Sequence, residues 1–198
     1  MLSQKVTAIN SKKNTLIAGV QIVPLVRHSD VRGGFSEVFS NDWNSATIEP
    51  QQWSIVDSIT GTLRGMHLHL RHEEYFSLIR GRAFIGLHDP RPGSPTYGLA
   101  MGVELDMNNP VAVIFPRGLI HGWYFSEDSI HLQAVSESYN NYGGDDNMGC
   151  LWSDNKLGIN WPGQPIHVAP RAEKFGSLQE LIEETMRIDP DFKYQPIG

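Results

Sequence analysis

The chain has 198 residues, of which 40% are hydrophobic and 19% charged, a composition typical of a globular domain in water. Its 16 basic and 22 acidic residues give a net charge of −6 without a long basic run, which argues against nucleic acid as the main partner. The single cysteine, Cys150, leaves no internal disulfide framework, and no segment resembles a signal peptide or a spanning helix. We therefore expect one cytoplasmic domain over residues 1–198, with no membrane partner.

Short apolar or alternating runs, separated by turns rich in glycine and proline, predict strands along most of the chain. The predicted strands are residues 19–26, 35–39, 51–58, 61–70, 75–80, 82–88, 98–104, 111–115, 121–125 and 130–136. Because these pieces are evenly spaced, they predict an all-β fold, most simply a jelly roll.

One helix is predicted near the end of the chain. Ser177 and Glu180 have the spacing of a capping box, which marks the start of a helix. Apolar residues then recur at helical spacing, at Leu178, Leu181, Ile182 and Met186. The dipeptide Asp189-Pro190 predicts the end of this short C-terminal helix.

The histidines follow a recognisable pattern. His67 and His69 lie two positions apart on a predicted strand, so their side chains share one face. Glu74 follows them, and His121 comes after the turn Pro116-Arg117-Gly118. This spacing resembles the two signature motifs of the cupin superfamily, a small β-barrel or jelly roll. Three histidines and one glutamate can bind either a substrate or a metal ion, and the spacing leaves both open.

Longer segments resemble the dTDP-4-dehydrorhamnose 3,5-epimerase family, a branch of the cupins that works without a metal. The resemblance runs from about Val23 to Pro162. Its segments are residues 30–37 (DVRGGFSE), 61–67, 79–81, 89–98 (DPRPGSPTYG), 115–122 (FPRGLIHG) and 152–162. Several linked motifs in one order are more specific than any single motif. The resemblance therefore predicts a cupin jelly-roll barrel, here with a short C-terminal helix.

The resemblance implies an isomerase that epimerises a 4-keto-6-deoxy sugar. The protons at C3 and C5 of such a sugar are acidic, because the resulting carbanion is stabilised as an enolate. A base removes a proton on one face and an acid returns one on the other. By resemblance, His67 is the base and Asp154 orients it, fixing its tautomer. A hydrogen-bonded core histidine and a turn-forming aspartate are the alternatives for these two residues.

The implied substrate is a nucleotide diphosphate sugar of deoxysugar or polysaccharide biosynthesis. Arg32 and Arg64 resemble the arginines around the diphosphate, where a planar guanidinium suits phosphate oxygens. Gln52 resembles an amide near the nucleotide or sugar, and His121 resembles a second active-site histidine. For the arginines, a solvated surface charge is the alternative.

The resemblance also implies a homodimer. Arg32, Phe35 and Glu37 fall in the segment that, in the family, crosses to the partner subunit and completes its site. In such a dimer, an edge strand that pairs with the partner subunit across a two-fold axis is no longer exposed to aggregation. For Phe35, packing in a core is the alternative to stacking on a base.

Three residues depart from the family's pattern. Gln133 stands where the family has the tyrosine that acts as the acid, and a carboxamide supplies no proton near neutral pH. The sequence therefore predicts epimerisation at C3 alone. Glu74 stands where the family has a lysine near the enolate, and a carboxylate there opposes negative charge. His69 stands where the family commonly has glutamine.

Two other functions remain open. The set His67, His69, Glu74 and His121 resembles a metal site, which would suit a metal-dependent cupin such as an isomerase or dioxygenase. A catalytically silent protein that binds sugar nucleotides is the third hypothesis, favoured mainly by Gln133. The nucleotide-sugar motifs favour the epimerase, for which the sequence predicts no cofactor and no metal.

Overall fold

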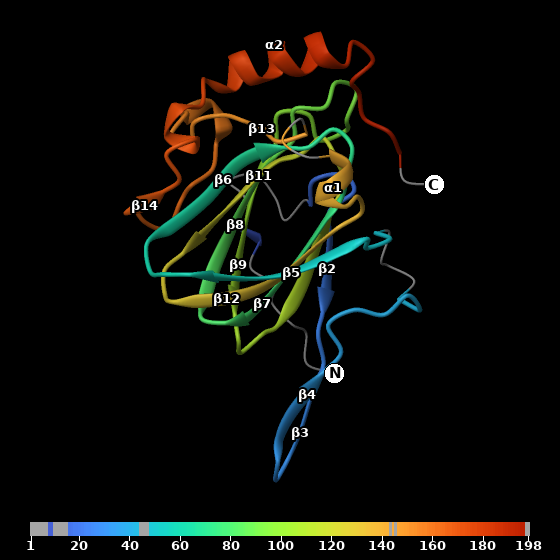
Figure 1. Ribbon diagram of the computed structural model, residues 1–198, viewed down its shortest axis with the longest axis vertical. Helices are drawn as coiled ribbons and strands as arrows, with labels where there is room; N and C mark the ends of the chain where they lie inside the picture. Colours follow the sequence, from blue (N-terminus) through green and yellow to red (C-terminus); the bar gives the residue numbers. More distant parts are fainter. Residues whose placement is uncertain (1–7, 10–15, 44–47, 143, 145, 197–198) are drawn as a thin grey trace.

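The computed structural model describes residues 8–9, 16–43, 48–142, 144 and 146–196 of the chain. Two β-sheets face each other, while a helix lies at one end of the molecule and a hairpin projects from the other (Figure 1). This is the arrangement of a jelly roll. The predicted all-β fold with a short C-terminal helix is therefore confirmed.

The first sheet carries the histidine motif. Its strands stand in the order β1 (Ala8–Ile9), β9 (Ala100–Asp106), β8 (Arg82–His88), β11 (Ile120–Phe125), β6 (Thr62–Leu68) and β13 (Met148–Gly149), and β14 (His167–Val168) also pairs with β6. All of these pairs are antiparallel except that of β14 with β6. β6 is therefore paired along both edges, with β11 on one side and the two C-terminal strands on the other.

The second sheet lies opposite the first. Its order is β2 (Gln21–Pro24), β10 (Val111–Phe115), β7 (Glu74–Arg80), β12 (Ser129–Val135) and β5 (Gln52–Ser58), all antiparallel. The strands β3 (Arg27–Asp30) and β4 (Gly33–Ser36) form a separate hairpin that projects from the body of the molecule (Figure 1).

Most predicted strands are confirmed, and β8 and β10 have the predicted bounds. The strand expected at residues 35–39 is wrong, because β4 covers Gly33–Ser36 and shares only Phe35 and Ser36 with it. Its partner β3 was not expected, since its sequence Arg-His-Ser-Asp is polar and all four residues are exposed. Alternation of apolar and polar residues identifies strands with one buried face, so it cannot find an exposed hairpin.

The main core lies between the sheets, because successive residues of a strand point to opposite faces. Phe76, Phe115 and Phe125 are at most 2% exposed and belong to one apolar cluster contributed by both sheets. Each such side chain contributes roughly 1.5–3 kcal/mol when it is fully buried. This cluster makes the interior rigid, so the polar side chains beside it have fixed positions.

The C-terminal segment covers the outer face of β6 and β11. Leu157, Leu178 and Leu181 pack there against Met66 and Leu68. Its elements are the 3₁₀ turns Asn155–Leu157 and Ala172–Lys174 and the helix α2 (Leu178–Ile188), and a short helix α1 (Tyr139–Tyr142) precedes them. No helix in the described part of the chain is both long and apolar enough to cross a membrane.

Candidate active site

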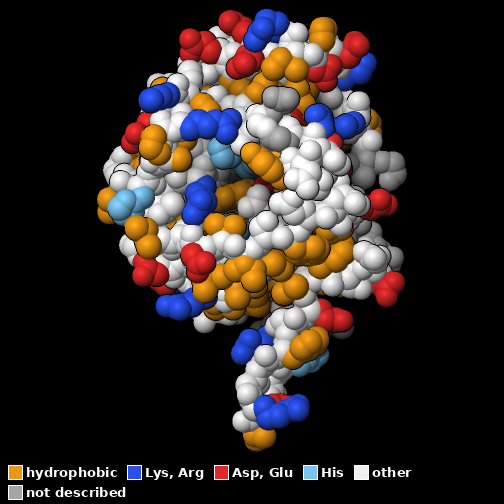
Figure 2. Space-filling model, in the orientation of Figure 1, with side chains coloured by type: hydrophobic (Ala, Val, Ile, Leu, Met, Phe, Trp, Pro, Cys, Tyr) orange, Lys and Arg blue, Asp and Glu red, His pale blue; other side chains and the backbone are white. Residues whose placement is uncertain are grey.

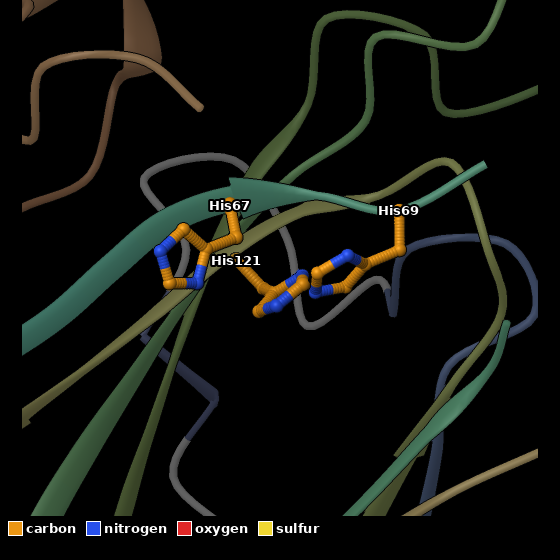
Figure 3. A group of neighbouring side chains, drawn as sticks. All are labelled: His67, His69 and His121. Atoms are coloured by element: carbon orange, nitrogen blue, oxygen red, sulfur yellow. The ribbon is translucent and has the colours of Figure 1, made fainter. Parts of the chain in front are cut away.

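A polar cluster interrupts the apolar interior between the sheets. His67 and His121 are direct partners in the register of β6 and β11, and His69 follows His67 by one full strand repeat. The His69 and His121 rings lie 5.0 Å apart between centroids, and the His67 ring lies about equally far from both, at 6.0 and 6.2 Å (Figure 3). Figure 2 shows a hollow in this face of the molecule, with a histidine inside it and Lys or Arg side chains at its rim.

His67 is the most accessible of these three imidazoles, being partly buried while His69 and His121 are 6% and 2% exposed. Its ring meets Phe175 edge to face at 5.9 Å. Burial, with His121 and His69 nearby, lowers the pKa of His67 to about 3. The ring is therefore neutral near pH 7, which is the form in which an imidazole can accept a proton.

The expected pairing of Asp154 with His67 requires a correction. The Asp154 carboxylate accepts hydrogen bonds from the backbone N–H groups of Lys156 (2.9 Å) and Leu178 (2.8 Å). No ion pair or hydrogen bond joins it to His67 among the described residues. Asp154 thus caps a 3₁₀ turn and the first turn of α2. A carboxylate at this position is also stabilised by the positive end of the helix dipole. The alternative for Asp154 given above, a turn-forming aspartate, describes these hydrogen bonds better.

Arg64 lies on β6, three residues before His67. Its guanidinium reaches from β6 to the opposite sheet, where Nε donates to the Ser58 hydroxyl (3.0 Å) and Nη2 donates to the Asp57 carbonyl (2.9 Å). Burial lowers its pKa from the usual 12.5, and the group stays charged in water. Arg64 is an exposed residue, and a guanidinium held by these two hydrogen bonds is suited to an anionic ligand.

Arg32, Phe35 and Glu37 lie on the projecting hairpin or just after it, and all three are exposed. Arg32 pairs with Asp30 at 2.5 Å, with 86% of its own side chain exposed. Because the hairpin points away from the two sheets, these residues are not brought together with the histidines of the same chain (Figure 1).

Gln52 and Gln133 come from the second sheet. Gln133 Nε2 donates to Glu74 Oε2 at 3.3 Å, so this amide joins the polar cluster. Gln52 Oε1 instead accepts the backbone N–H of Tyr139 (2.9 Å) and holds the start of helix α1. Tyr124, another phenol of the sequence, packs on the outer face of its sheet and lies outside the cluster.

Glu74 occupies the centre of the cluster. Its Oε1 lies 3.1 Å from His69 Nε2 and 3.6 Å from both His72 Nε2 and His121 Nε2. Burial raises the pKa of Glu74, but His121, His69 and His72 outweigh it and hold the pKa well below its usual value. The sequence pattern singled out Glu74 as a departure, and the structure shows which groups surround it.

Two residues of this cluster were missed by sequence reasoning. His72 Nδ1 lies 2.9 Å from Asp146 Oδ2. Burial lowers the pKa of His72, but its contacts with Asp146 and Glu74 outweigh burial and raise the pKa to about 9. Asp146 precedes β13 in an irregular segment, 74 positions after His72, so no local pattern connects the two.

Comparisons with known proteins identify the family and the fold that the chain resembles. A protein-family model described as dTDP-4-dehydrorhamnose 3,5-epimerase matches residues 14–180. The chain is 31% identical over 175 residues to a dTDP-4-dehydrorhamnose 3,5-epimerase of Sinorhizobium fredii, covering 84% of this chain and 87% of that protein. A solved double mutant of ChmJ, a 3'-monoepimerase from Streptomyces bikiniensis in complex with dTDP, has a TM-score of 0.77 and 25% identity, covering 90% and 91% of the two chains. The epimerase RmlC of Legionella pneumophila has the same fold, with a TM-score of 0.77, 24% identity, and coverage of 96% and 99%.

Proposed function

The chain belongs to the dTDP-4-dehydrorhamnose 3,5-epimerase family, and from that premise we propose that it epimerises a nucleotide-linked 4-keto-6-deoxy hexose at C3 alone. It is an isomerase, as the members of this family are. The observation that carries the proposal is the neutral, partly buried imidazole of His67 in the hollow between the sheets, beside a polar cluster to which Gln133 contributes an amide.

Proton abstraction is assigned to His67. Its nitrogen is unprotonated near neutral pH, and it is the one histidine of the three that remains partly exposed to a ligand entering the hollow. A base of this kind removes the proton next to the ketone, and the electron pair moves into an enolate. Asp154 is a cap elsewhere, and no carboxylate among the described residues forms a hydrogen bond or ion pair with His67, so His67 acts here without that support.

The restriction to C3 rests on Gln133. This residue occupies the sheet opposite β6, where its amide contacts Glu74. An amide does not release a proton near neutral pH, so no side chain at this position can protonate the enolate from the far face. Water can return the proton at the more accessible carbon. The likeness to a 3'-monoepimerase supports this restriction.

Substrate binding is assigned to the groups around the hollow. Arg64 offers its guanidinium to the diphosphate, and breaking its bonds to Ser58 and Asp57 frees the donors that phosphate oxygens require. His121 and Gln52 line the sugar and nucleotide ends. dTDP in the related ChmJ structure supports a nucleotide sugar as the substrate class.

We also propose that the protein works as a homodimer. The hairpin carries Phe35 and Val31 with 64% and 105% of their surface exposed, and Ile55 on the outer face of the edge strand β5 is 73% exposed. Apolar surface of this kind is stabilised by a partner. Arg32 and Phe35 then complete the site of the partner subunit. A monomer at micromolar concentration in a sedimentation experiment would contradict this arrangement.

The proposed reaction is tested by proton NMR of dTDP-linked 4-keto-6-deoxyglucose in deuterated water with the purified protein. We expect the C3 signal to disappear by exchange while the C5 signal persists. Strong exchange at both carbons would show that another group supplies the second proton. No exchange at either carbon, in protein that binds dTDP, would overturn the proposed activity.

A further inference from the structure

Helix α1 places a phenol beside the histidines of the hollow. Tyr142, the last residue of this helix, stacks on the ring of His72 with centroids 4.3 Å apart and lies 6.5 Å from the ring of His69. Its side chain is partly buried. No residue in the described part of the chain forms a hydrogen bond with its hydroxyl group, so this O–H is available to a ligand.

Four other tyrosines are held elsewhere in the molecule. Tyr75 is fully buried, and its hydroxyl donates to a backbone carbonyl of the segment between β4 and β5. Tyr124 packs on the outer face of its sheet. Tyr97 lies in the loop between β8 and β9, and Tyr194 lies in the segment after α2. Within the described residues, none of these four rings contacts a histidine of the cluster.

The other phenol of α1 does not reach the histidines either. Tyr139 is 55% exposed and meets Tyr142 edge to face at 5.4 Å, with no ring contact to a histidine that the structure describes. The chain has six tyrosines, and all six lie in described residues. Tyr142 is therefore the one phenol of this chain that contacts the polar cluster.

Contacts to both sheets fix the position of α1. Gln52 of β5, in the second sheet, accepts the backbone N–H of Tyr139 at 2.9 Å. Arg71, just after β6 of the first sheet, donates to the carbonyl of Asn141 (3.1 Å) and to the carboxylate of Glu137 (3.0 Å). The helix is thus tied to both layers, so its phenol has a defined position beside the hollow.

We propose that Tyr142 is the acid that returns a proton to the enolate, on the face opposite His67. His67 belongs to β6 in the first sheet, whereas α1 follows β12 of the second, and Figure 1 shows α1 beside the end of β6. The base and the phenol therefore approach the hollow from different layers, as inversion at one carbon requires. The role of Tyr142 rests on the proposed function, in which it replaces water as the source of the returned proton.

The proton transfers form a closed cycle. His67 takes the proton from C3, and the electron pair of that C–H bond forms the enolate. The O–H bond of Tyr142 then breaks while a C3–H bond forms on the opposite face, the C4 ketone returns, and a phenolate remains. The phenolate takes a proton from solvent and His67 releases its own to solvent, so both residues regain their starting state.

The surroundings of the phenol suit a proton donor. Burial and the nearby Glu74 carboxylate raise the pKa of Tyr142 above its ordinary value, so the phenol keeps its proton until the enolate forms. His72, stacked on the ring, is positively charged near pH 7, because Asp146 and Glu74 outweigh burial and raise its pKa to about 9. A cation against the ring stabilises the phenolate that the transfer leaves.

Removing the hydroxyl group separates proton abstraction from inversion. In Tyr142→Phe, His67 still removes the C3 proton and returns one from solvent on the same face, so deuterium exchange into the substrate should stay within about threefold of the wild-type rate. The C3-inverted product should form at least about tenfold more slowly, since loss of a general acid typically costs ~10²–10⁴ in rate. Inversion is measured in ordinary water by borohydride reduction of the ketone and chromatography of the resulting hexoses.

Tyr139→Phe is the matched control, because it removes a phenol from the same helix that does not contact the histidines. It should keep both rates near those of the wild type. Circular dichroism and calorimetry with dTDP check the fold and the binding site of Tyr142→Phe. Equal losses of exchange and inversion in Tyr142→Phe overturn the inference, as does a loss of inversion in Tyr139→Phe as large as that in Tyr142→Phe.

The wild-type protein separates this inference from the proposed function. Wild-type protein that neither exchanges nor inverts C3 overturns the proposed function, and the role of Tyr142 with it. Wild-type protein that inverts C3, together with a Tyr142→Phe variant that inverts it equally fast, supports the epimerase and overturns the role of Tyr142 alone.

Discussion

At the scale of single residues, the hollow contains two kinds of histidine that sequence spacing alone does not distinguish. His69 and His121 have Nδ1 fixed by backbone carbonyls, whereas His67 meets the edge of a phenylalanine and remains partly exposed. The strand repeat predicted that His67 and His69 share a face. It did not predict their different hydrogen bonds. The partner of His69, Asp146, lies 77 positions away, and the contact of His121 with Leu119, two positions before it, depends on the local backbone conformation.

Replacing His67 by asparagine should lower deuterium exchange at the sugar carbon by roughly 10²–10⁴, the usual cost of losing a general base. Binding of dTDP, measured by calorimetry, should change little, because Arg64 and the hairpin are untouched. His88→Asn serves as the control for loss of a buried histidine. A His67→Asn variant that exchanges at the wild-type rate would mean that another residue is the base.

Replacing Gln133 by tyrosine should give measurable exchange at C5. The phenol would face the hollow from the sheet opposite β6, where the wild-type amide supplies no proton. It would also remove the hydrogen bond from the amide to Glu74 (3.3 Å), so exchange at C3 should fall at the same time. The ratio of the two rates from one NMR sample is the readout, and an unchanged ratio would refute the role assigned to Gln133.

At the scale of elements, the strands were predictable because their sequences are short apolar or alternating runs. Burial alternates along β5, whereas β8, β10 and β11 are buried at nearly every position. The hairpin of β3 and β4 and the two-residue strands β13 and β14 were not predictable, since they lack a buried face or are too short to show a pattern. The helix α2 was predictable from its capping box. The role of Asp154 was not, because its second hydrogen bond goes to Leu178, 24 positions away.

Asp154→Ala tests that corrected role. Loss of a cap typically costs about 0.5–2 kcal/mol, so we expect the free energy of unfolding in urea to fall by this amount. Deuterium exchange at saturating substrate should change less than tenfold, since Asp154 does not contact His67. A loss of exchange as large as that in His67→Asn, with unchanged stability, would restore Asp154 to the catalytic machinery.

The strand β12 carries a buried histidine that should make stability depend on pH. His131 is stacked on Phe76 at 4.5 Å and is fully buried. Burial lowers its pKa from 6.5 to about 4. Below pH 6.5 the unfolded chain binds a proton that the folded chain does not, so this residue destabilises the fold progressively as the pH falls to about 4.

His131→Leu removes that proton uptake. When the pH falls from 6.5 to 4, the free energy of unfolding should decrease by about 2–3 kcal/mol less in the variant than in the wild type. Urea unfolding at several pH values measures this, with pH 7.5 as the reference at which His131 is neutral in both states. Parallel pH profiles of the two proteins would show that His131 is already protonated in the fold or does not titrate.

At the scale of the whole molecule, the hairpin and the hollow lie far apart in one chain, so a shared site requires two chains. Mixing Arg32→Ala protein with His67→Asn protein tests this. In a mixed dimer, one site combines His67 of the first chain with Arg32 of the second and is intact. Exchange should rise well above the sum of the separate variants. No rise after subunits have mixed, as shown by mass spectrometry, would place Arg32 outside the partner's site.

The pairing of β6 also bears on how the chain reaches its fold. β13 and β14 close the free edge of β6 at its two ends, through Leu68 and His67 on one side and Thr62 and Leu63 on the other. On the ribosome, that edge stays open until residues 148–168 have been made, and contacts between such distant segments form slowly. A chain cut short before β13 would contain His67, His69 and His121 and still expose an edge that invites aggregation.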